Sequence, residues 1–241
     1  MKAIILAGGK GERLRPFTDN YPKGMVKING KPILEYETQW LKQYGITEII
    51  FACGYKHEKI KEHFGDGTKF GICAQYSIED EPLGRGGAVK KAWELIDSKE
   101  TILVMNGDIY TDLNLNDLIQ AHMKRKDIIA TICLFPFKSS YGVVWVNETG
   151  LVESFEEKRT LPYWVNGGIY IFAPGVQDYL PETGDHEITT FPELAKKKLL
   201  QGYKSLDYWR GIDTIKDLNE FVSDAKHFSV IRKAVGNLEP N

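Results

Sequence analysis

Glycines and separated cations follow the first apolar segment of the chain. Residues 2–6 (KAIIL) run into residues 8–11 (GGKG), and Arg13 and Lys23 come next. Glycines let backbone N–H groups approach an anion closely. A guanidinium and an ammonium can in addition spread positive charge over several phosphate oxygens. We therefore expect this segment to bind phosphate.

The spacing excludes two familiar phosphate-binding loops. The dinucleotide-binding fingerprint requires G-x-G-x-x-G, and residues 9–14 (GKGERL) lack its third glycine. That absence disfavours an NAD-type oxidoreductase. The P-loop requires Ser or Thr after its Gly-Lys pair, but Pro32 follows Gly30 and Lys31. A plain glycine turn stays open as an alternative if the loop is taken alone.

A carboxylate and a second glycine cluster stand further along the chain. Asp108 follows an apolar run at 101–105 (TILVM), and ligands of open α/β sheets lie at the carboxyl ends of strands. A carboxylate there suits Mg²⁺, although Asn-Gly-Asp can also be a simple turn. Residues 81–92 (EPLGRGGAVKKA) can offer a backbone edge to a nucleobase, or can simply begin a helix.

The N-terminal segment carries a family resemblance. Residues 7–25 (AGGKGERLRPFTDNYPKGM) resemble the signature GGxGxRLxPxTxxxPKPM of the sugar-1-phosphate nucleotidyltransferases. Further motifs of that family follow in order through essentially the whole chain: GKPILEY (30–36), EPLGRGGAVKKA (81–92), NGD (106–108), YGVV (141–144), EEK (156–158), NGGIYIF (166–172) and DT (213–214).

The resemblance implies a reaction and roles for individual residues. A sugar 1-phosphate attacks the α-phosphorus of a nucleoside triphosphate, pyrophosphate leaves, and Mg²⁺ is required. The family pattern makes Arg13, Lys23 and Lys158 the catalytic cations, and it makes Asp108 and Asp213 the Mg²⁺ ligands. It places the nucleotide on Leu6, Ala7, Gly8, Gly9, Gly11, Arg13, Lys23, Glu79 and Gly84, and the sugar phosphate on Gly142, Glu157, Lys158, Asn166 and Gly168.

The chain departs from the family pattern at three places. Gly24 replaces a proline after Lys23, which loosens the backbone there. Arg159 replaces the proline that usually follows the EEK motif. Residues 209–214 (WRGIDT) differ from the common WxDIGT, and the DT ending resembles the cytidylyltransferase branch.

The motifs disagree about the nucleotide. EPLGRGGAVKKA resembles mannose- and heptose-1-phosphate guanylyltransferases, whereas the DT ending favours CTP and the GERLRPFT opening also occurs in uridylyltransferases. We expect GTP with a mannose- or heptose-type 1-phosphate, with CTP or UTP as the alternative. A non-catalytic nucleotide-sugar-binding regulatory subunit is the alternative from another class, and the retention of all five catalytic and metal-binding residues argues against it.

Alternating strand and helix patterns must position these residues. They predict a Rossmann-like mixed, mainly parallel sheet flanked by helices, with a β-hairpin region over one edge. We expect strands at 2–6, 48–53, 72–78, 102–105, 128–134, 168–172 and 203–209, helices from Pro32 to Gly45 and at 57–64, 84–96, 115–124 and 214–235, and a hairpin built from 143–146 and 151–155.

Composition limits the remaining possibilities. The 241 residues are 42% hydrophobic, carry 31 Lys and Arg against 33 Asp and Glu, and contain no apolar run long enough to span a bilayer. We therefore expect no nucleic-acid partner, no membrane association and one nucleotidyltransferase domain over 1–241, without a β-helix acyltransferase domain. Three widely separated cysteines fit a reducing cytoplasm, and a homo-oligomer is possible.

Overall fold

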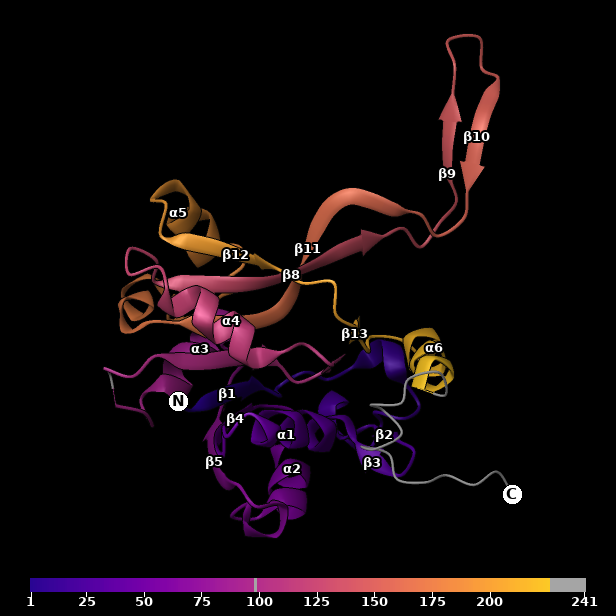
Figure 1. The fold of residues 1–241 in the computed structure, drawn as a ribbon. Helices are drawn as coiled ribbons and strands as arrows, with labels where there is room; N and C mark the ends of the chain where they lie inside the picture. Colours follow the sequence, from indigo (N-terminus) through magenta and orange to yellow (C-terminus); the bar gives the residue numbers. More distant parts are fainter. Residues whose placement is uncertain (98, 226–241) are drawn as a thin grey trace.

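A seven-stranded sheet forms the centre of the computed structural model, which describes residues 1–97 and 99–225 (Figure 1). From edge to edge its strands are β12 (Leu200–Lys204), β8 (Ala130–Lys138), β11 (Thr160–Phe172), β6 (Ile102–Asn106), β1 (Ala3–Leu6), β4 (Glu48–Cys53) and β5 (Cys73–Ile78). β11 is antiparallel to both of its neighbours, and all other pairs are parallel. The prediction of a mixed, mainly parallel sheet is therefore confirmed.

Helices cover both faces of the sheet. Strands buried on both faces read as continuous apolar runs, and in β1 the side chains of Ala3 and Ile5 enter one core while Ile4 enters the other. The first core takes side chains from α1 (Ile33–Gln43), α2 (His57–Phe64) and α4 (Leu115–Met123). The second takes them from α3 (Gly84–Trp93) and α5 (Thr190–Lys196), on the opposite face.

Local signals in the sequence set several helix ends. α1 begins directly after Pro32 and is followed by Gly45, whose φ is +76°. α2 ends at Gly65, which has φ +57°. At α4 the Asn114 side chain accepts a hydrogen bond from the N–H of Asn116 at 3.2 Å and caps the helix. The predicted ends of these helices agree with the structure to within a residue or two.

A two-stranded hairpin projects from the sheet beside β8 and β11 (Figure 1). It consists of β9 (Val143–Val146) and β10 (Val152–Glu156), joined by a turn in which the Asn147 side chain accepts hydrogen bonds from the N–H groups of Thr149 and Leu151, each at 3.0 Å. The prediction of a hairpin at this point is correct. β11, which follows it, begins eight residues before the predicted strand at 168–172 (168 − 160 = 8).

Smaller elements complete the described chain. β7 (Ile109–Thr111) pairs with β13 (Trp209–Gly211), and β2 (Lys27–Ile28) pairs with β3 (Lys31–Pro32). The predicted strand at 203–209 is wrong, because its two ends belong to β12 and β13 in different sheets. The last helix among the described residues, α6, covers Ile215–Ala225, and the predicted continuation over 226–235 lies outside those residues. The short 3-10 helices are η1 (Glu12–Leu14), η2 (Lys23–Met25), η3 (Thr68–Phe70) and η4 (Pro174–Tyr179).

Within the described part of the chain, no helix combines the length and the hydropathy needed to cross a membrane.

Candidate active site

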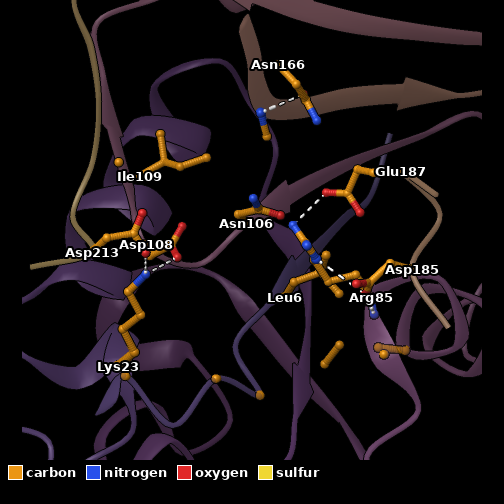
Figure 2. Close-up of a pocket in the computed structure, with 18 of the residues that line it drawn as sticks. Leu6, Lys23, Arg85, Asn106, Asp108, Ile109, Asn166, Asp185, Glu187 and Asp213 are labelled. Atoms are coloured by element: carbon orange, nitrogen blue, oxygen red, sulfur yellow. Dashed lines mark hydrogen bonds and ion pairs between the residues drawn. The ribbon is translucent and has the colours of Figure 1, made fainter. Parts of the chain in front are cut away.

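A cavity of about 930 Å³ opens where β1 and β6 end (Figure 2). The carboxyl ends of parallel strands are the usual place for a ligand in this kind of sheet. Twelve of the residues predicted to form the site line this cavity: Leu6, Gly8, Gly9, Gly11, Arg13, Lys23, Glu79, Gly84, Asp108, Asn166, Gly168 and Asp213. The structure therefore brings together segments that are widely separated in the sequence.

The glycine-rich loop packs directly against Lys23. The N–H of Lys23 donates to the carbonyl of Gly9 at 3.2 Å. Gly11 has φ +64°, and a Cβ there would lie 3.0 Å from Cβ of Lys23 and 2.9 Å from Cγ2 of Thr18. Thr18 also donates its hydroxyl to the Gly11 carbonyl at 2.8 Å. Glycine is therefore required at position 11 both for its backbone conformation and for the close contact.

The Lys23 ammonium lies between two carboxylates (Figure 2). It donates to Oδ2 of Asp108 and, at 2.5 Å, to Oδ1 of Asp213. A guanidinium nitrogen of Arg13 donates to the same Asp213 oxygen at 2.9 Å. The cluster therefore holds two anions and two cations at the cavity wall.

Electrostatics favour the charged forms of Lys23 and Asp213. Burial by itself would lower the pKa of Lys23, but the two carboxylates outweigh that effect and raise it above its usual value. For Asp213, burial would raise the pKa, but the hydrogen bond and charge of Lys23, together with the charges of Arg13 and Arg85, outweigh burial and lower it. Near neutral pH this part of the cavity therefore presents an ammonium and ionised carboxylate oxygens together.

Backbone hydrogen bonds and a side-chain cap fix the two aspartates. The carbonyl of Asp108 accepts from the N–H of Ile212 at 2.8 Å, which ties the loop after β6 to the segment that carries Asp213. Asp217, in the first turn of α6, accepts from the N–H groups of Asp213 and Thr214 at 3.2 and 2.8 Å. The two carboxylates therefore belong to one connected backbone arrangement.

Gly24 allows the turn after Lys23 to pack closely. It is buried, and a Cβ there would lie 2.7 Å from Cγ of Leu34 and 2.8 Å from the carbonyl oxygen of Gly107. The absence of a side chain therefore brings η2 against both α1 and the loop that carries Asp108. Hydrogen bonds and ion pairs hold Lys23 in place without the proline that the family pattern has at position 24.

The donor set at Asp108 and Asp213 suits Mg²⁺. Both side chains reach one nitrogen atom, so their oxygens lie close enough to share a small cation. Magnesium commonly takes one or two carboxylates from the protein and completes its octahedral shell with water and phosphate oxygens. Among residues 1–97 and 99–225 no group of three or more His, Cys, Asp or Glu side chains is placed to hold a metal.

Glu79 and Gly84 lie together at another part of the cavity. Oε2 of Glu79 accepts from the N–H of Leu83 at 2.9 Å, and Glu79 also lines a second cavity of about 420 Å³. Burial raises the pKa of Glu79, against the opposing effect of the Leu83 N–H. Gly84 has φ +72° and contacts the backbone of Gly184. The glycines at 84–87 thus chiefly accommodate the chain around Gly184, and Gly84 alone of them lines the cavity.

A charged pair that the sequence analysis missed lies beside Asn166 and Gly168. A guanidinium nitrogen of Arg85 donates to Oε1 of Glu187 at 2.7 Å (Figure 2). The Asn166 side chain accepts from the N–H of Gly168 at 3.0 Å and donates to the hydroxyl of Tyr170 at 2.9 Å. This region offers several hydrogen-bonding groups to a polyhydroxylated ligand.

Four predicted site residues do not line the cavity. Ala7 is buried beneath it, and its N–H donates to the carbonyl of Ala52 at 2.8 Å. Gly142 and Glu157 lie near each other at the base of the hairpin, because a Cβ on Gly142 would be 3.0 Å from Oε2 of Glu157. Lys158, in the same region, has an exposed side chain that lies 3.8 Å from Glu220 of α6. The roles of these four residues remain predictions.

Some of the lining residues were given no role by the sequence analysis. Trp209 donates its indole N–H to the Gly167 carbonyl at 2.8 Å and stacks on Phe135. Asp185 and Glu187 flank His186, for which sequence analysis gave no role, and His186 is fully buried among aromatic rings. Two hints were available, since Arg85 stands inside the glycine cluster of residues 81–92 and Trp209 begins the segment WRGIDT.

Comparison with known proteins shows which proteins this chain is similar to. The nucleotidyl transferase family model matches residues 2–227. A D-glycero-alpha-D-manno-heptose 1-phosphate guanylyltransferase of Campylobacter jejuni is 38% identical over 92% of this chain and 99% of its own length. A UTP–glucose-1-phosphate uridylyltransferase of Synechocystis is 35% identical over 90% of this chain, which spans 61% of that protein.

Solved structures agree with the sequence relatives. The crystal structure of HddC from Yersinia pseudotuberculosis complexed with GMP-PN matches with a TM-score of 0.73 and 27% identity. The match covers 92% of this chain and 98% of that one. The resemblance drawn from the motifs is confirmed, and the chain belongs to the nucleotidyl transferase family, among its sugar-1-phosphate nucleotidyltransferases.

Proposed function

We propose that the protein transfers a nucleotidyl group from a nucleoside triphosphate to a sugar 1-phosphate and releases pyrophosphate. The observation that carries this proposal is the Lys23 ammonium between Asp108 and Asp213, with Arg13 beside them, at the wall of a cavity lined by the glycine-rich loop. Such a cluster suits chemistry in which two polyanions must approach each other.

The reaction needs positioning and charge neutralisation more than proton transfer. A sugar-phosphate oxygen, already ionised, forms a bond to the α-phosphorus. The bond from that phosphorus to the oxygen shared with the β-phosphate breaks, and its electron pair leaves on pyrophosphate. Backbone N–H groups of residues 8–11 and the Arg13 guanidinium would hold the triphosphate, and the Lys23 ammonium would approach the reacting phosphate.

Asp108 and Asp213 would hold the magnesium ion, and Mg²⁺ would supply neutralisation of phosphate charge. The carboxylates would reach the ion from the two segments that the hydrogen bond between Ile212 and Asp108 joins. The Lys23 ammonium, which lies between the two carboxylates in this structure, would then turn toward the phosphate oxygens, while its backbone stays bonded to the glycine-rich loop.

GTP is the proposed nucleotide, and Glu79 supports this choice. One of its oxygens accepts the Leu83 N–H, and the other stands near Gly8 at the cavity. An ionised carboxylate only accepts hydrogen bonds. Guanine presents two adjacent donors, N1–H and the N2 amino group, which a carboxylate can pair with. Uracil places a single N–H between two carbonyl oxygens, and cytosine places its amino group beside an acceptor.

A mannose- or heptose-type 1-phosphate is the proposed acceptor. Arg85, Glu187 and Asn166 supply donors and acceptors for several hydroxyl groups. Lys158 at the hairpin base would contact the sugar phosphate. A reducing cytoplasm is the proposed compartment, since all three cysteines are free thiols in the structure.

Pyrophosphate release tests the proposal. The purified protein is incubated with Mg²⁺, each of GTP, CTP, UTP and dTTP, and mannose, heptose, glucose or N-acetylglucosamine 1-phosphate. We expect GTP with a mannose- or heptose-type acceptor to give the highest kcat/KM. Preference for another nucleotide would replace the guanine assignment. Tight binding of a nucleotide sugar without turnover of any pair would contradict enzymatic activity.

A further inference from the structure

A buried glutamate lies behind the loop that carries Asp108. Glu37 is on α1, its residue is 2% exposed, and Oε1 of its side chain accepts from the N–H of Ile109 at 2.9 Å. Its Oε2 is buried and has no hydrogen-bond partner among the described residues. Glutamate is among the residues least often fully buried, so its position behind a candidate metal site requires an explanation.

Hydrogen bonds fix three successive residues of the Asp108 loop. The N–H of Gly107 donates to the carbonyl of Leu6 at 2.9 Å, and the carbonyl of Asp108 accepts from Ile212 at 2.8 Å. Glu37 supplies the third bond, to the residue directly after Asp108. Glu37 is the only one of these three partners that contributes a side chain. The other two partners are backbone groups, which a side-chain substitution does not remove.

We propose that Glu37 is a positioning residue, which orients Asp108 for divalent-cation binding by accepting the Ile109 N–H. This inference rests on the metal role of Asp108 in the proposed function. Partners outside the ligand shell commonly set the orientation of metal-binding carboxylates, and their loss typically weakens metal affinity by about 10- to 100-fold. The role requires an acceptor oxygen at Oε1, and it does not require a negative charge.

Two substitutions separate the acceptor from the charge. Glu37→Gln keeps an acceptor oxygen and the volume of the side chain. Glu37→Met keeps the approximate volume and removes the acceptor, so the Ile109 N–H becomes a buried donor without a partner. Because either variant can lower stability, Tyr36→Phe serves as the matched control. The Tyr36 hydroxyl is on the same helix and donates to the carbonyl of Ile28 at 2.9 Å, so Tyr36→Phe removes a hydrogen bond of α1 and leaves the bond between Glu37 and Ile109 in place.

Metal affinity is measured apart from turnover. Water-proton relaxation enhancement reports Mn²⁺ bound to the protein in the presence of a non-hydrolysable GTP analogue, and thermal unfolding reports the fold. We expect Glu37→Gln to bind Mn²⁺ within about 2-fold of the wild type and Glu37→Met to bind it about 10- to 100-fold more weakly. Excess Mg²⁺ should recover much of the kcat of Glu37→Met, and its KM for the sugar 1-phosphate should change little.

The outcomes are distinguishable. Wild-type affinity in Glu37→Met, with a fall in melting temperature like that of Tyr36→Phe, would show a purely structural role and overturn the inference. Equal weakening by Glu37→Gln and Glu37→Met would assign the effect to charge and overturn it as well. If the wild type gave no water-proton relaxation enhancement with Mn²⁺, that result would contradict the metal role of Asp108 and, with it, this inference. Pyrophosphate release by the wild type tests the transferase activity itself.

Discussion

At the scale of single residues, Lys23 has to satisfy two carboxylates at once. Asp108 and Asp213 would repel each other if both were ionised in a partly buried place, and the ammonium between them removes that penalty. Arg13 shares the charge of Asp213 at 2.9 Å, but its side chain is far more exposed than that of Lys23, 68% against 12%. Lys23 therefore contributes the more buried charge, and Arg13 the more exposed one.

In the proposed function, the choice of nucleobase also depends on a single residue, Glu79. If the Glu79 carboxylate pairs with guanine, Glu79→Gln replaces one acceptor with a donor and leaves the shape nearly unchanged. We expect kcat/KM for GTP to fall by about 10- to 100-fold, as for loss of one paired base contact. The ratio of kcat/KM for UTP to kcat/KM for GTP should therefore rise. Steady-state kinetics with both nucleotides measure this ratio. An unchanged ratio of GTP to UTP would show that another group selects the base.

At the scale of elements, a glycine joins three segments. η2, α1 and the Asp108 loop meet at Gly24, where a Cβ would lie under 3.0 Å from two neighbours. We expect Gly24→Ala to lower the free energy of unfolding by about 1–3 kcal/mol through overpacking, and to lower kcat because the displaced turn carries Lys23. Chemical denaturation and steady-state kinetics measure these two effects.

Gly175 provides the matched control for that substitution. A Cβ on Gly175 would meet Ile129 at 3.5 Å, an ordinary contact distance. Gly175→Ala should therefore change stability by no more than about 0.5 kcal/mol and leave kcat unaltered. If Gly24→Ala behaved in the same way, the close approach at Gly24 would have no part in positioning Lys23.

The hairpin carries the other element-scale prediction. Lys158 lies at its base, 3.8 Å from Glu220, and does not line the cavity. If it contacts the sugar phosphate when substrate is bound, Lys158→Ala should raise KM for the sugar 1-phosphate by about 10-fold and leave nucleotide binding unchanged. Lys196→Ala, at an exposed lysine of α5, serves as the control. Equal kinetics for both variants would remove Lys158 from the site.

Local and long-range signals differ in what they predict here. α2 was predicted with its observed limits, because its apolar spacing and Gly65 are local features. The strand predicted at 203–209 fails because β13 pairs with β7, about a hundred residues earlier in the chain. Arg85 and Glu187 likewise meet only through the packing of α3 against the segment around Gly184. By contrast, the motifs predicted the glycine-rich loop and both aspartates as site residues, because each lies within a contiguous sequence motif.

At the scale of the whole molecule, two buried histidines predict acid sensitivity. His122 and His186 are 4% and 0% exposed, and burial lowers the pKa of each. Burial therefore disfavours the protonated form of both in the folded protein, whereas the unfolded chain protonates them near pH 6.5. Stability is therefore fully present above about pH 6.5 and is lost as the pH falls below it, by up to about 1.4 kcal/mol per pH unit for each histidine.

A substitution at His122 tests this slope, which is the change in unfolding free energy per pH unit. Nδ1 of His122 lies 2.8 Å from the Thr131 hydroxyl, and His122→Asn can keep a hydrogen bond there without a titratable ring. We expect the variant to lose less unfolding free energy than the wild type between pH 7 and pH 5, as measured by urea denaturation. An identical slope in both proteins would contradict the assignment.

The most direct test of the whole account concerns Asp108. The measurement is pyrophosphate release with GTP, mannose 1-phosphate and increasing Mg²⁺, made on the wild type and on Asp108→Ala, with thermal unfolding as the check on folding. We predict magnesium-dependent turnover in the wild type and a loss of at least about 100-fold in a variant that unfolds at a similar temperature. Unchanged magnesium-dependent turnover in Asp108→Ala would contradict the account.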